Sequence, residues 1–192
     1  MSDAASTPSA TAACCDPAEF RQGMRRLAAA VCVIATENNA GLRAGLTATA
    51  VCSVSASPPT LLVCVNRQNS SCEAIRDAGR FSVNALEQND RSIAEQFASP
   101  VDAGQKFAHG TWGTLQTGAP VLQSAIVGFD CIVQNAVDVG THTIFFGQIA
   151  GLRYAEHPGA PLMYAYGEYG NFQTLTTALQ LNHFMTPNWE YS

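Results

Sequence analysis

The segment that most limits the possible folds runs from Gly45 to Asn66 and reads GLTATAVCSVSASPPTLLVCVN. It contains no charged side chain, and its β-branched and small residues favour strands over helices. The adjacent Pro58 and Pro59 cannot lie inside a central strand, so they mark a turn. The segment therefore predicts two consecutive strands, over 47–55 and 58–66, in a domain built mainly from β structure.

The rest of the chain predicts more strands than helices. A helix begins at the capping residue Asp16, with Pro17 in its first turn and apolar residues at helical spacing, and two more helices are expected at 70–79, with a serine cap, and at 90–99. Further strands are expected at 29–37, 80–86 and 161–170, with a long hairpin over 127–155 that turns near Val139 and Gly140. Helices do not alternate with strands, so a closed antiparallel barrel with peripheral helices is favoured over a Rossmann sheet.

Composition narrows the class of protein. A chain of 192 residues, 47% hydrophobic and 13% charged, can bury a core without a metal or a disulfide. The net charge of -5 argues against nucleic acid or an anionic membrane as partner. Seven cysteines without a C-x-x-C pair indicate reduced thiols, of which Cys32, Cys52, Cys64 and Cys131 are expected to be buried.

The same reasoning divides the chain into three segments. Residues 1–15 lack the apolar core of a signal peptide and predict a disordered tail, 16–172 form the folded domain, and 173–192 are an extension of weak periodicity. No apolar run approaches the roughly 20 residues of a membrane span, so a cytoplasmic protein is expected.

The motifs of several enzyme classes are absent from the sequence. It has no glycine-rich nucleotide loop, no nucleophile elbow and no H-E-x-x-H, and its four histidines are scattered, so no metal site is expected. Hydroxyl and amide groups remain, at Thr47, Thr49, Ser53, Ser55, Asn66 and 69–71. Such groups suit a planar heteroaromatic ligand, and serines at a helix start suit a phosphate. The alternative is that these are ordinary strand and capping residues.

Several of these segments together resemble one family. Gly45–Asn66 is similar to the signature of the short-chain flavin reductases, and the similarity continues at 20–36, 80–86, 95–98 and 137–149. The family includes the reductase component of two-component 4-hydroxyphenylacetate 3-monooxygenase, which is similar in TATAVCSV, in the proline pair and in the Gly-Thr-His triplet.

The resemblance implies a mainly β protein, an antiparallel split β-barrel with a few peripheral α-helices, that forms a homodimer. It implies an NAD(P)H-dependent flavin reductase that reduces FMN or FAD with NADH, less often NADPH, and supplies reduced flavin to a separate flavin-dependent monooxygenase. Hydride transfer between the two rings needs no acid–base pair, which agrees with the uncharged motif. Two alternatives stay open: a tightly bound flavin that passes electrons to another acceptor such as a corrinoid, and a flavin-binding module without turnover.

The resemblance also assigns residues to the site. Thr47, Ala48, Thr49 and Ser53 would face the isoalloxazine ring, and Cys64, Val65 and Asn66 would form the strand end beside it. The phosphate would be contacted by Ser70 and Ser71, and Phe107 would lie near the flavin. Gly140, Thr141 and His142 would bind the nicotinamide, with His142 as the catalytic hydrogen-bond donor. Thr141 stands where many members have aspartate and the last strand lacks the arginines of relatives, so the choices between NADH and NADPH and between FMN and FAD stay open.

Overall fold

A computed structural model describes residues 15–173 of the chain. Its helices are α1 (Pro17–Met24), α2 (Ser70–Ala78), the short 3-10 helix η1 (Gln88–Asp90), α3 (Arg91–Ala98) and α4 (Ala103–Phe107). Its strands are β1 (Ala29–Ala30), β2 (Cys32–Glu37), β3 (Arg43–Ala48), β4 (Val51–Ala56), β5 (Pro59–Asn66), β6 (Arg80–Ala85), β7 (Trp112–Thr114), β8 (Pro120–Leu122), β9 (Val127–Val139), β10 (His142–Tyr154), β11 (Leu162–Ala165) and β12 (Glu168–Asn171).

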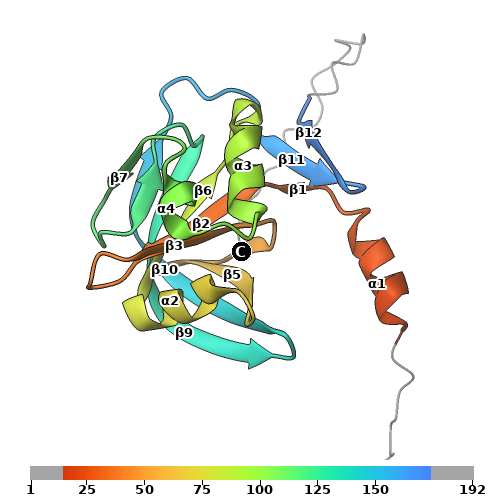
Figure 1. Cartoon of the computed structure of the whole chain (residues 1–192), viewed down its shortest axis with the longest axis horizontal. Coiled ribbons are helices and arrows are strands. Elements are labelled where there is room, and N and C mark those ends of the chain that lie inside the picture. The colour runs from red at the N-terminus through yellow and green to blue at the C-terminus, as the bar shows by residue number, and fades with distance from the viewer. Residues whose placement is uncertain (1–14, 174–192) are drawn as a thin grey trace, which may run out of the picture.

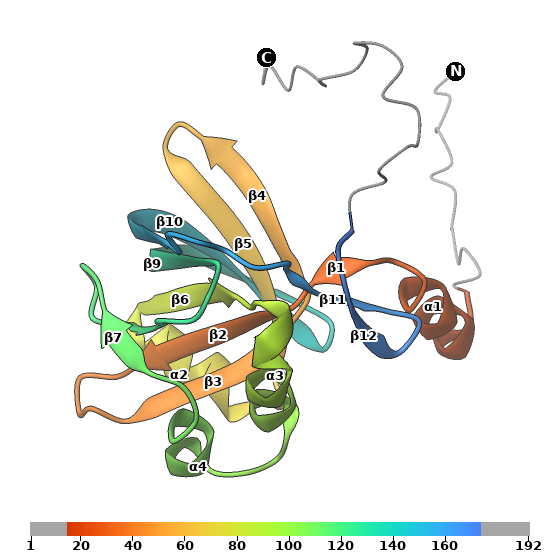
Figure 2. The same ribbon diagram turned by 90° about the horizontal axis from the view of Figure 1, so that it is seen from above.

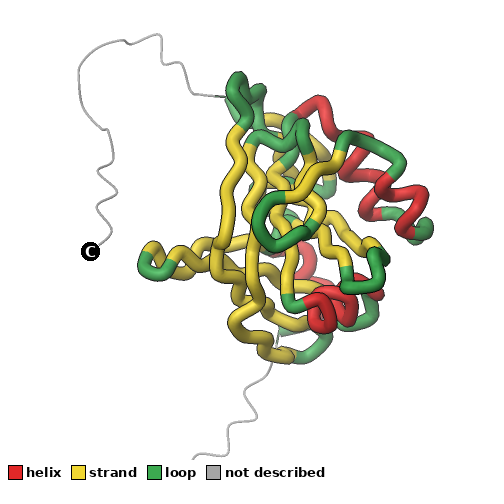
Figure 3. Tube along the Cα trace, turned by 90° about the vertical axis from the view of Figure 1, so that its left-hand side faces the viewer, coloured by secondary structure: helices red, strands yellow, loops and turns green. Residues whose placement is uncertain are grey.

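Seven antiparallel strands form the main sheet, in the order β3-β2-β6-β9-β10-β5-β4. Strands make up the body of the molecule and helices lie around it (Figures 1 and 3). The mainly β, antiparallel fold class is confirmed. Within residues 15–173 the edge strands β3 and β4 are not paired with each other, so the barrel is open between them and the prediction of a closed barrel is wrong.

Two apolar clusters lie on opposite sides of β2 and β3. On one side, Ile75 of α2 packs against Val63 and Phe145 in the barrel interior. On the other side, Phe97 of α3 packs against Val33 and Ala35. Figure 1 shows the same arrangement, with α2 on one side of these strands and α3 and α4 on the other.

Helix α2 forms where the sequence predicts it, with a different cap. The side chain of Asn69, not of a serine, accepts a hydrogen bond from the backbone N–H of Ser71. Gly79 ends the helix in the left-handed conformation, φ 65°, which glycine adopts without strain. Asparagine and serine cap helices equally well, so sequence alone does not separate the two positions.

Two expected strands are each divided in the structure. The segment 47–55 breaks at Thr49, and its halves β3 and β4 lie at opposite edges of the main sheet. The segment 161–170 is a hairpin, because Tyr166 and Gly167 both take positive φ, 57° and 87°, as a two-residue turn requires. A tyrosine rarely adopts this conformation, so Tyr166 gives no cue to the turn in the sequence. Strand β1 pairs with β11 in this second, smaller sheet.

Helix α1 begins at Asp16 as predicted, but it buries none of its side chains. Phe20, Met24 and the following Leu27 are 57%, 49% and 61% exposed, and α1 stands apart from the main sheet (Figure 2). The β4–β5 hairpin also projects from the body in this view. Apolar surfaces therefore remain open on the single chain.

The remaining predictions concern thiols, termini and membranes. The six cysteines of the described segment are free; Cys32 and Cys131 are buried as expected, Cys64 is half-buried, and Cys52 is exposed, contrary to expectation. The predicted tail at 1–15 and extension at 173–192 lie almost wholly outside the described residues, and the domain boundaries stay predictions. None of the helices between residues 15 and 173 is long and apolar enough to cross a membrane.

Candidate functional site

Two strand ends bring the asparagine of the motif and the Gly-Thr-His triplet together. Asn66 ends β5, His142 begins β10, and the two residues lie directly opposite each other in the antiparallel pair. The backbone N–H of Arg67 donates to the carbonyl of Thr141 over 2.9 Å, and the Thr141 hydroxyl lies 2.9 Å from Nδ1 of His142. Gly140 takes φ 55° in the turn. Four of the predicted residues thus share one end of the barrel.

The first turn of α2 lies beside this strand end. The N–H of Asn69 donates to the carbonyl of Asn66 over 2.9 Å, which brings the adjacent Ser70 and Ser71 close to it. Ser71 is buried and its N–H is already bonded to the Asn69 side chain, whereas Ser70 is exposed. Of the two serines predicted to contact a phosphate, Ser70 is therefore the one open to a ligand.

The loop after β3 reaches the middle of β5. The carbonyl of Ala50 accepts from the N–H of Cys64 over 3.1 Å, so Ala48 and the exposed Thr49 lie near Cys64. Val65, the next residue of β5, is fully buried in the core and offers a ligand at most its backbone. This part of the motif therefore forms a second group of predicted residues, which adjoins the first along β5.

Thr47 and Phe107 lie on the other side of β3. The Thr47 hydroxyl donates to the carbonyl of Ala94 over 2.6 Å, so it ties β3 to α3. The Phe107 ring packs edge-on against the Phe97 and Trp112 rings, with centroids 5.0 and 4.9 Å away. Both predicted residues therefore make contacts on the side of β3 that α3 covers.

Ser53 also lies away from the strand end that carries Asn66 and His142. It pairs with Leu61, five positions before Asn66 along β5, which corresponds to about 17 Å at the rise of a strand. Its assignment to the ring-facing group stays a prediction without support from this geometry.

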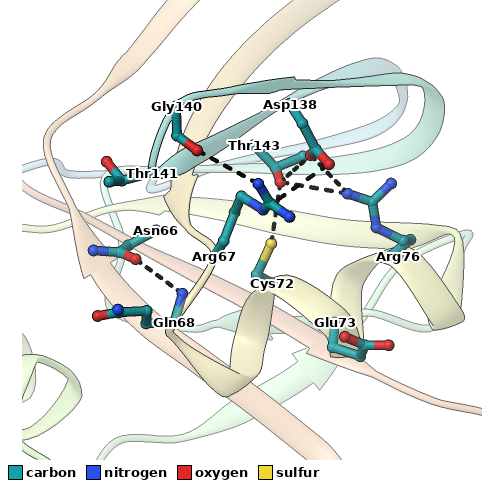
Figure 4. Close-up of a pocket in the computed structure, with 10 residues that line it drawn as sticks. All are labelled: Asn66, Arg67, Gln68, Cys72, Glu73, Arg76, Asp138, Gly140, Thr141 and Thr143. Atoms are coloured by element: carbon teal, nitrogen blue, oxygen red, sulfur yellow. Dashed lines mark hydrogen bonds and ion pairs between the residues drawn. The ribbon is translucent and has the colours of Figure 1, made fainter.

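A polar cleft of about 550 Å³ opens beside the first group (Figure 4). The residues that line it are Asn66, Arg67, Gln68, Cys72, Glu73, Arg76, Asp138, Gly140, Thr141 and Thr143. Only three of them belong to the predicted site. Sequence reasoning passed over the arginines and acids, although Arg67 directly follows Asn66 and Asp138 stands two positions before Gly140.

Asp138 connects the charged groups of the cleft. Its carboxylate accepts from the Thr143 hydroxyl over 2.6 Å and from Nη2 of Arg76 over 2.9 Å, and Nε of Arg67 lies 3.9 Å away. The hydrogen bond from Thr143, together with the two guanidinium groups, lowers the pKa of Asp138. The carboxylate therefore holds two arginines side by side at the mouth of the cleft.

The outer face of the same strands is apolar. Residues of β5 alternate between the buried Leu61, Val63 and Val65 and the half-buried Leu62 and Cys64. Register places residues of the neighbouring strands on this second side as well, among them the polar Asn135 opposite Phe146. We define the outer apolar face as the apolar residues on this side: Leu62 and Cys64 of β5, Ile144 and Phe146 of β10, and Val137 and Val139 of β9. None of them is charged, and Asn66 and His142 lie at the end of this face.

Comparison with known proteins identifies the family. The family model described as flavin reductase like domain matches residues 24–173. The FMN reductase (NADH) RutF of Agrobacterium fabrum is 44% identical over 135 residues, 70% of this chain and 77% of that protein. The structure of the flavin reductase PheA2 in its native state matches at 32% identity with a TM-score of 0.73, covering 82% of this chain and 99% of that chain.

The styrene monooxygenase flavin reductase (SMOB) from Pseudomonas putida S12 is similar as well, at 27% identity and a TM-score of 0.72, covering 81% of this chain and 97% of that chain. The residues matched by the family model include the strands that carry Gly45–Asn66 and the Gly-Thr-His triplet. The family prediction is confirmed: the chain belongs to the flavin reductase like domain family, and with it to the oxidoreductases.

Proposed function

We propose that this flavin reductase transfers a hydride from NADH to FMN or FAD and releases the reduced flavin to a separate flavin-dependent monooxygenase. The observation that carries the proposal is the meeting of Asn66 and His142 at the end of an uncharged apolar face. Curated relatives named FMN reductase (NADH) support the nicotinamide and the flavin, and the reductase of styrene monooxygenase supports the oxygenase partner.

The residues at this strand end fit a flavin. A flavin ring is planar and apolar on its faces, with hydrogen-bonding atoms along its edges. Cys64 and Ile144 offer apolar contact on the outer face, and Asn66 and His142 offer an amide and an imidazole at its end. When bound, the flavin and the nicotinamide supply the hydride chemistry themselves, so this chain has to bind and orient the two rings and exclude water.

The role of His142 follows from its place. Its Nδ1 faces the Thr141 hydroxyl, which leaves Nε2 free to bond a ligand. A donor at this position orients the carboxamide of a nicotinamide without taking part in proton transfer. We therefore assign His142 to nicotinamide binding, in agreement with the triplet in which it stands.

The proposal includes a homodimer, because the site lies on the outer apolar face, and an apolar surface is unfavourable to leave in contact with water. The outer apolar face contains Val137 and Val139, which are 41% and 56% exposed in the single chain. Edge strand β4 beside it carries no charge and is exposed along nearly its whole length, although exposed edge strands usually carry charges that prevent pairing. A second copy of this chain, which presents the same face, would cover both.

The enzyme function is tested by adding free FMN and free FAD separately to the purified protein with NADH and following the loss of nicotinamide absorbance. Turnover that rises with free flavin supports the proposal. Turnover that needs a different acceptor favours the alternative of a tightly bound flavin, and no turnover with NADH or NADPH contradicts both enzyme functions.

The homodimer is tested with one charge on the outer apolar face. Val137→Arg should convert the dimer to a monomer, measured by light scattering after size-exclusion chromatography. Leu42→Arg is the matched control, since Leu42 is 67% exposed and directly precedes β3, outside this face. A dimer that persists in Val137→Arg, or a wild-type protein that is monomeric, would contradict the dimer.

A further inference from the structure

Helix α1 and the β11–β12 hairpin form an open surface that the proposed flavin site does not use. Phe20, Met24 and Leu27 recur at intervals of four and three residues, so they lie along one side of α1 and of the turn that follows it. All three are exposed, and Figures 1 and 2 both show α1 beside this hairpin. Large apolar side chains in such a row indicate a surface that another segment covers.

Two adjoining hollows continue this surface. One, of about 420 Å³, lies on the β11–β12 hairpin, and its walls include Ala28, Tyr166 and Phe172. The other, of about 370 Å³, has Arg25, Arg26 and Tyr166 among its walls. Tyr166 belongs to both, and its backbone N–H donates to the carbonyl of Arg25, so the turn of the hairpin joins them. We define the α1 groove as these two hollows together with Phe20, Met24 and Leu27.

We propose that the C-terminal segment of the same chain, residues 174–192, lies in the α1 groove. The last two described residues, Phe172 and Gln173, are themselves walls of the larger hollow, so the segment begins at the groove. It also lies beyond the barrel common to the family, whose model ends at residue 173. The inference does not depend on the flavin chemistry, because no residue of the groove belongs to the predicted site or to the outer apolar face.

The composition of this segment suits the groove. Apolar and aromatic side chains recur along it, at Leu175, Leu179, Leu181, Phe184, Met185, Trp189 and Tyr191. These can cover the row on α1 and fill the larger hollow, which removes apolar surface of both from water. The segment therefore brings enough apolar surface to bury the exposed side of α1.

The charges are complementary as well. The segment has one carboxylate, Glu190, and no lysine or arginine. Of the described residues, the larger hollow takes Glu168 and no basic side chain, whereas the smaller hollow takes Arg25 and Arg26. Within residues 15–173 neither of these arginines forms an ion pair. We therefore expect Glu190 at the smaller hollow, where an arginine can bond its carboxylate.

The covalent connection favours the chain's own segment over a second copy. A segment attached at the rim of the groove is present there at an effective concentration of about millimolar, as for other short flexible connections. A second copy of the chain has to compete at its concentration in solution. The groove is therefore assigned to the segment that begins beside it.

Hydrogen exchange of the full chain, followed by mass spectrometry, tests the proposal. In wild type the amides of 174–192 should exchange more slowly than those of a free peptide of the same sequence. Leu27→Gln should speed their exchange about tenfold, because the burial of one large apolar side chain is lost. Leu42→Gln is the matched control, since Leu42 is 67% exposed, lies outside the groove and should leave the exchange as in wild type.

Two outcomes of this measurement overturn the proposal. One is a wild-type segment that exchanges as fast as the free peptide, and the other is equal exchange of the segment in Leu27→Gln and Leu42→Gln. The same spectra follow β2 and β6, whose exchange should stay unchanged in both variants, since neither leucine belongs to the core.

Photo-cross-linking distinguishes the chain's own segment from that of a second copy. With p-benzoylphenylalanine in place of Phe184, cross-links should form to peptides from 17–28 or 162–173, and the product should have the mass of one chain on a denaturing gel. A product with the mass of two chains would assign the groove to a second copy, and cross-links only to other peptides would place the segment on another surface; either result overturns the proposal. Absence of flavin turnover would contradict the proposed function and leave this inference unaffected.

Discussion

Replacing Gly147 by alanine tests how closely the barrel core is packed beneath the strand that carries His142. Gly147 lies on β10, five residues after His142, at a bulge opposite β9. A Cβ placed there would come 2.5 Å from the tip of the Phe81 ring and 2.9 Å from Cβ of Cys131. Phe81 and Cys131 are both fully buried, so neither can move into open space.

The expected cost follows from this overpacking. Extra methyl groups in a well-packed core cost about 1–3 kcal/mol, and for a domain of this size each kcal/mol lowers Tm by roughly 2–4 °C. Gly147→Ala should therefore lower Tm by roughly 2–12 °C and shift the urea midpoint without changing the slope. Gly170→Ala is the control, because nothing lies within 4 Å of a Cβ at that position.

A second substitution separates this clash from other effects. Phe81→Leu shortens the side chain that the new methyl group meets, so it should cost less in the Gly147→Ala background than in wild type. The coupling should be on the order of 1 kcal/mol, as for residues in contact. The reasoning is refuted if Gly147→Ala is as stable as Gly170→Ala, or if the costs of Gly147→Ala and Phe81→Leu simply add.

Three further predictions concern the site and its surroundings. His142→Ala should raise KM for NADH about two- to tenfold, the worth of one neutral hydrogen bond, and weaken flavin binding less; an unchanged KM would remove His142 from the nicotinamide site. Burial raises the pKa of Cys32 and Cys131 to about 12, so mass spectrometry after alkylation should find the exposed Cys15 modified and these two unmodified until the protein unfolds. Folding lowers the pKa of Asp138, so its charge stabilises the fold at pH values above the ordinary pKa of an aspartate. The stability lost in Asp138→Asn at neutral pH should therefore shrink as the pH falls below about 4. A stability difference between the variant and wild type that stays constant in urea titrations across that range would contradict this.

Strand content and helix starts could be predicted because their signals are local. The apolar run 58–66 and the capped helix at Asp16 depend on neighbouring residues, and the structure contains both. The break at Thr49 could not be predicted, because the small residues on both sides of it suit a strand equally well. The left-handed Tyr166 is required by the two-residue turn between β11 and β12, against the preference of a tyrosine.

The site was predicted where one strand end carries it and missed where several elements contribute. Asn66 and His142 belong to recognisable motifs, and the pairing of β5 with β10 brings them together. The cleft needs Arg76 from α2 and Asp138 from β9, which are 62 positions apart in the chain. No periodicity connects such residues, so only the register of the hairpin and the position of α2 show that they meet.

The lack of charge along β5 is explained by what covers its two sides. Leu61, Val63 and Val65 point into the core, and Leu62 and Cys64 point to the outer apolar face, which the proposed homodimer would cover. A charge at any of these positions would lose its hydration, at a cost of several kcal/mol unless it were paired. The first charged residue is Arg67, one position beyond the strand, where the open cleft keeps its guanidinium in water and beside Asp138. The strand therefore carries no charge because both its sides lie on buried surfaces. The first charge comes at Arg67 because the chain there leaves these surfaces and reaches the open cleft.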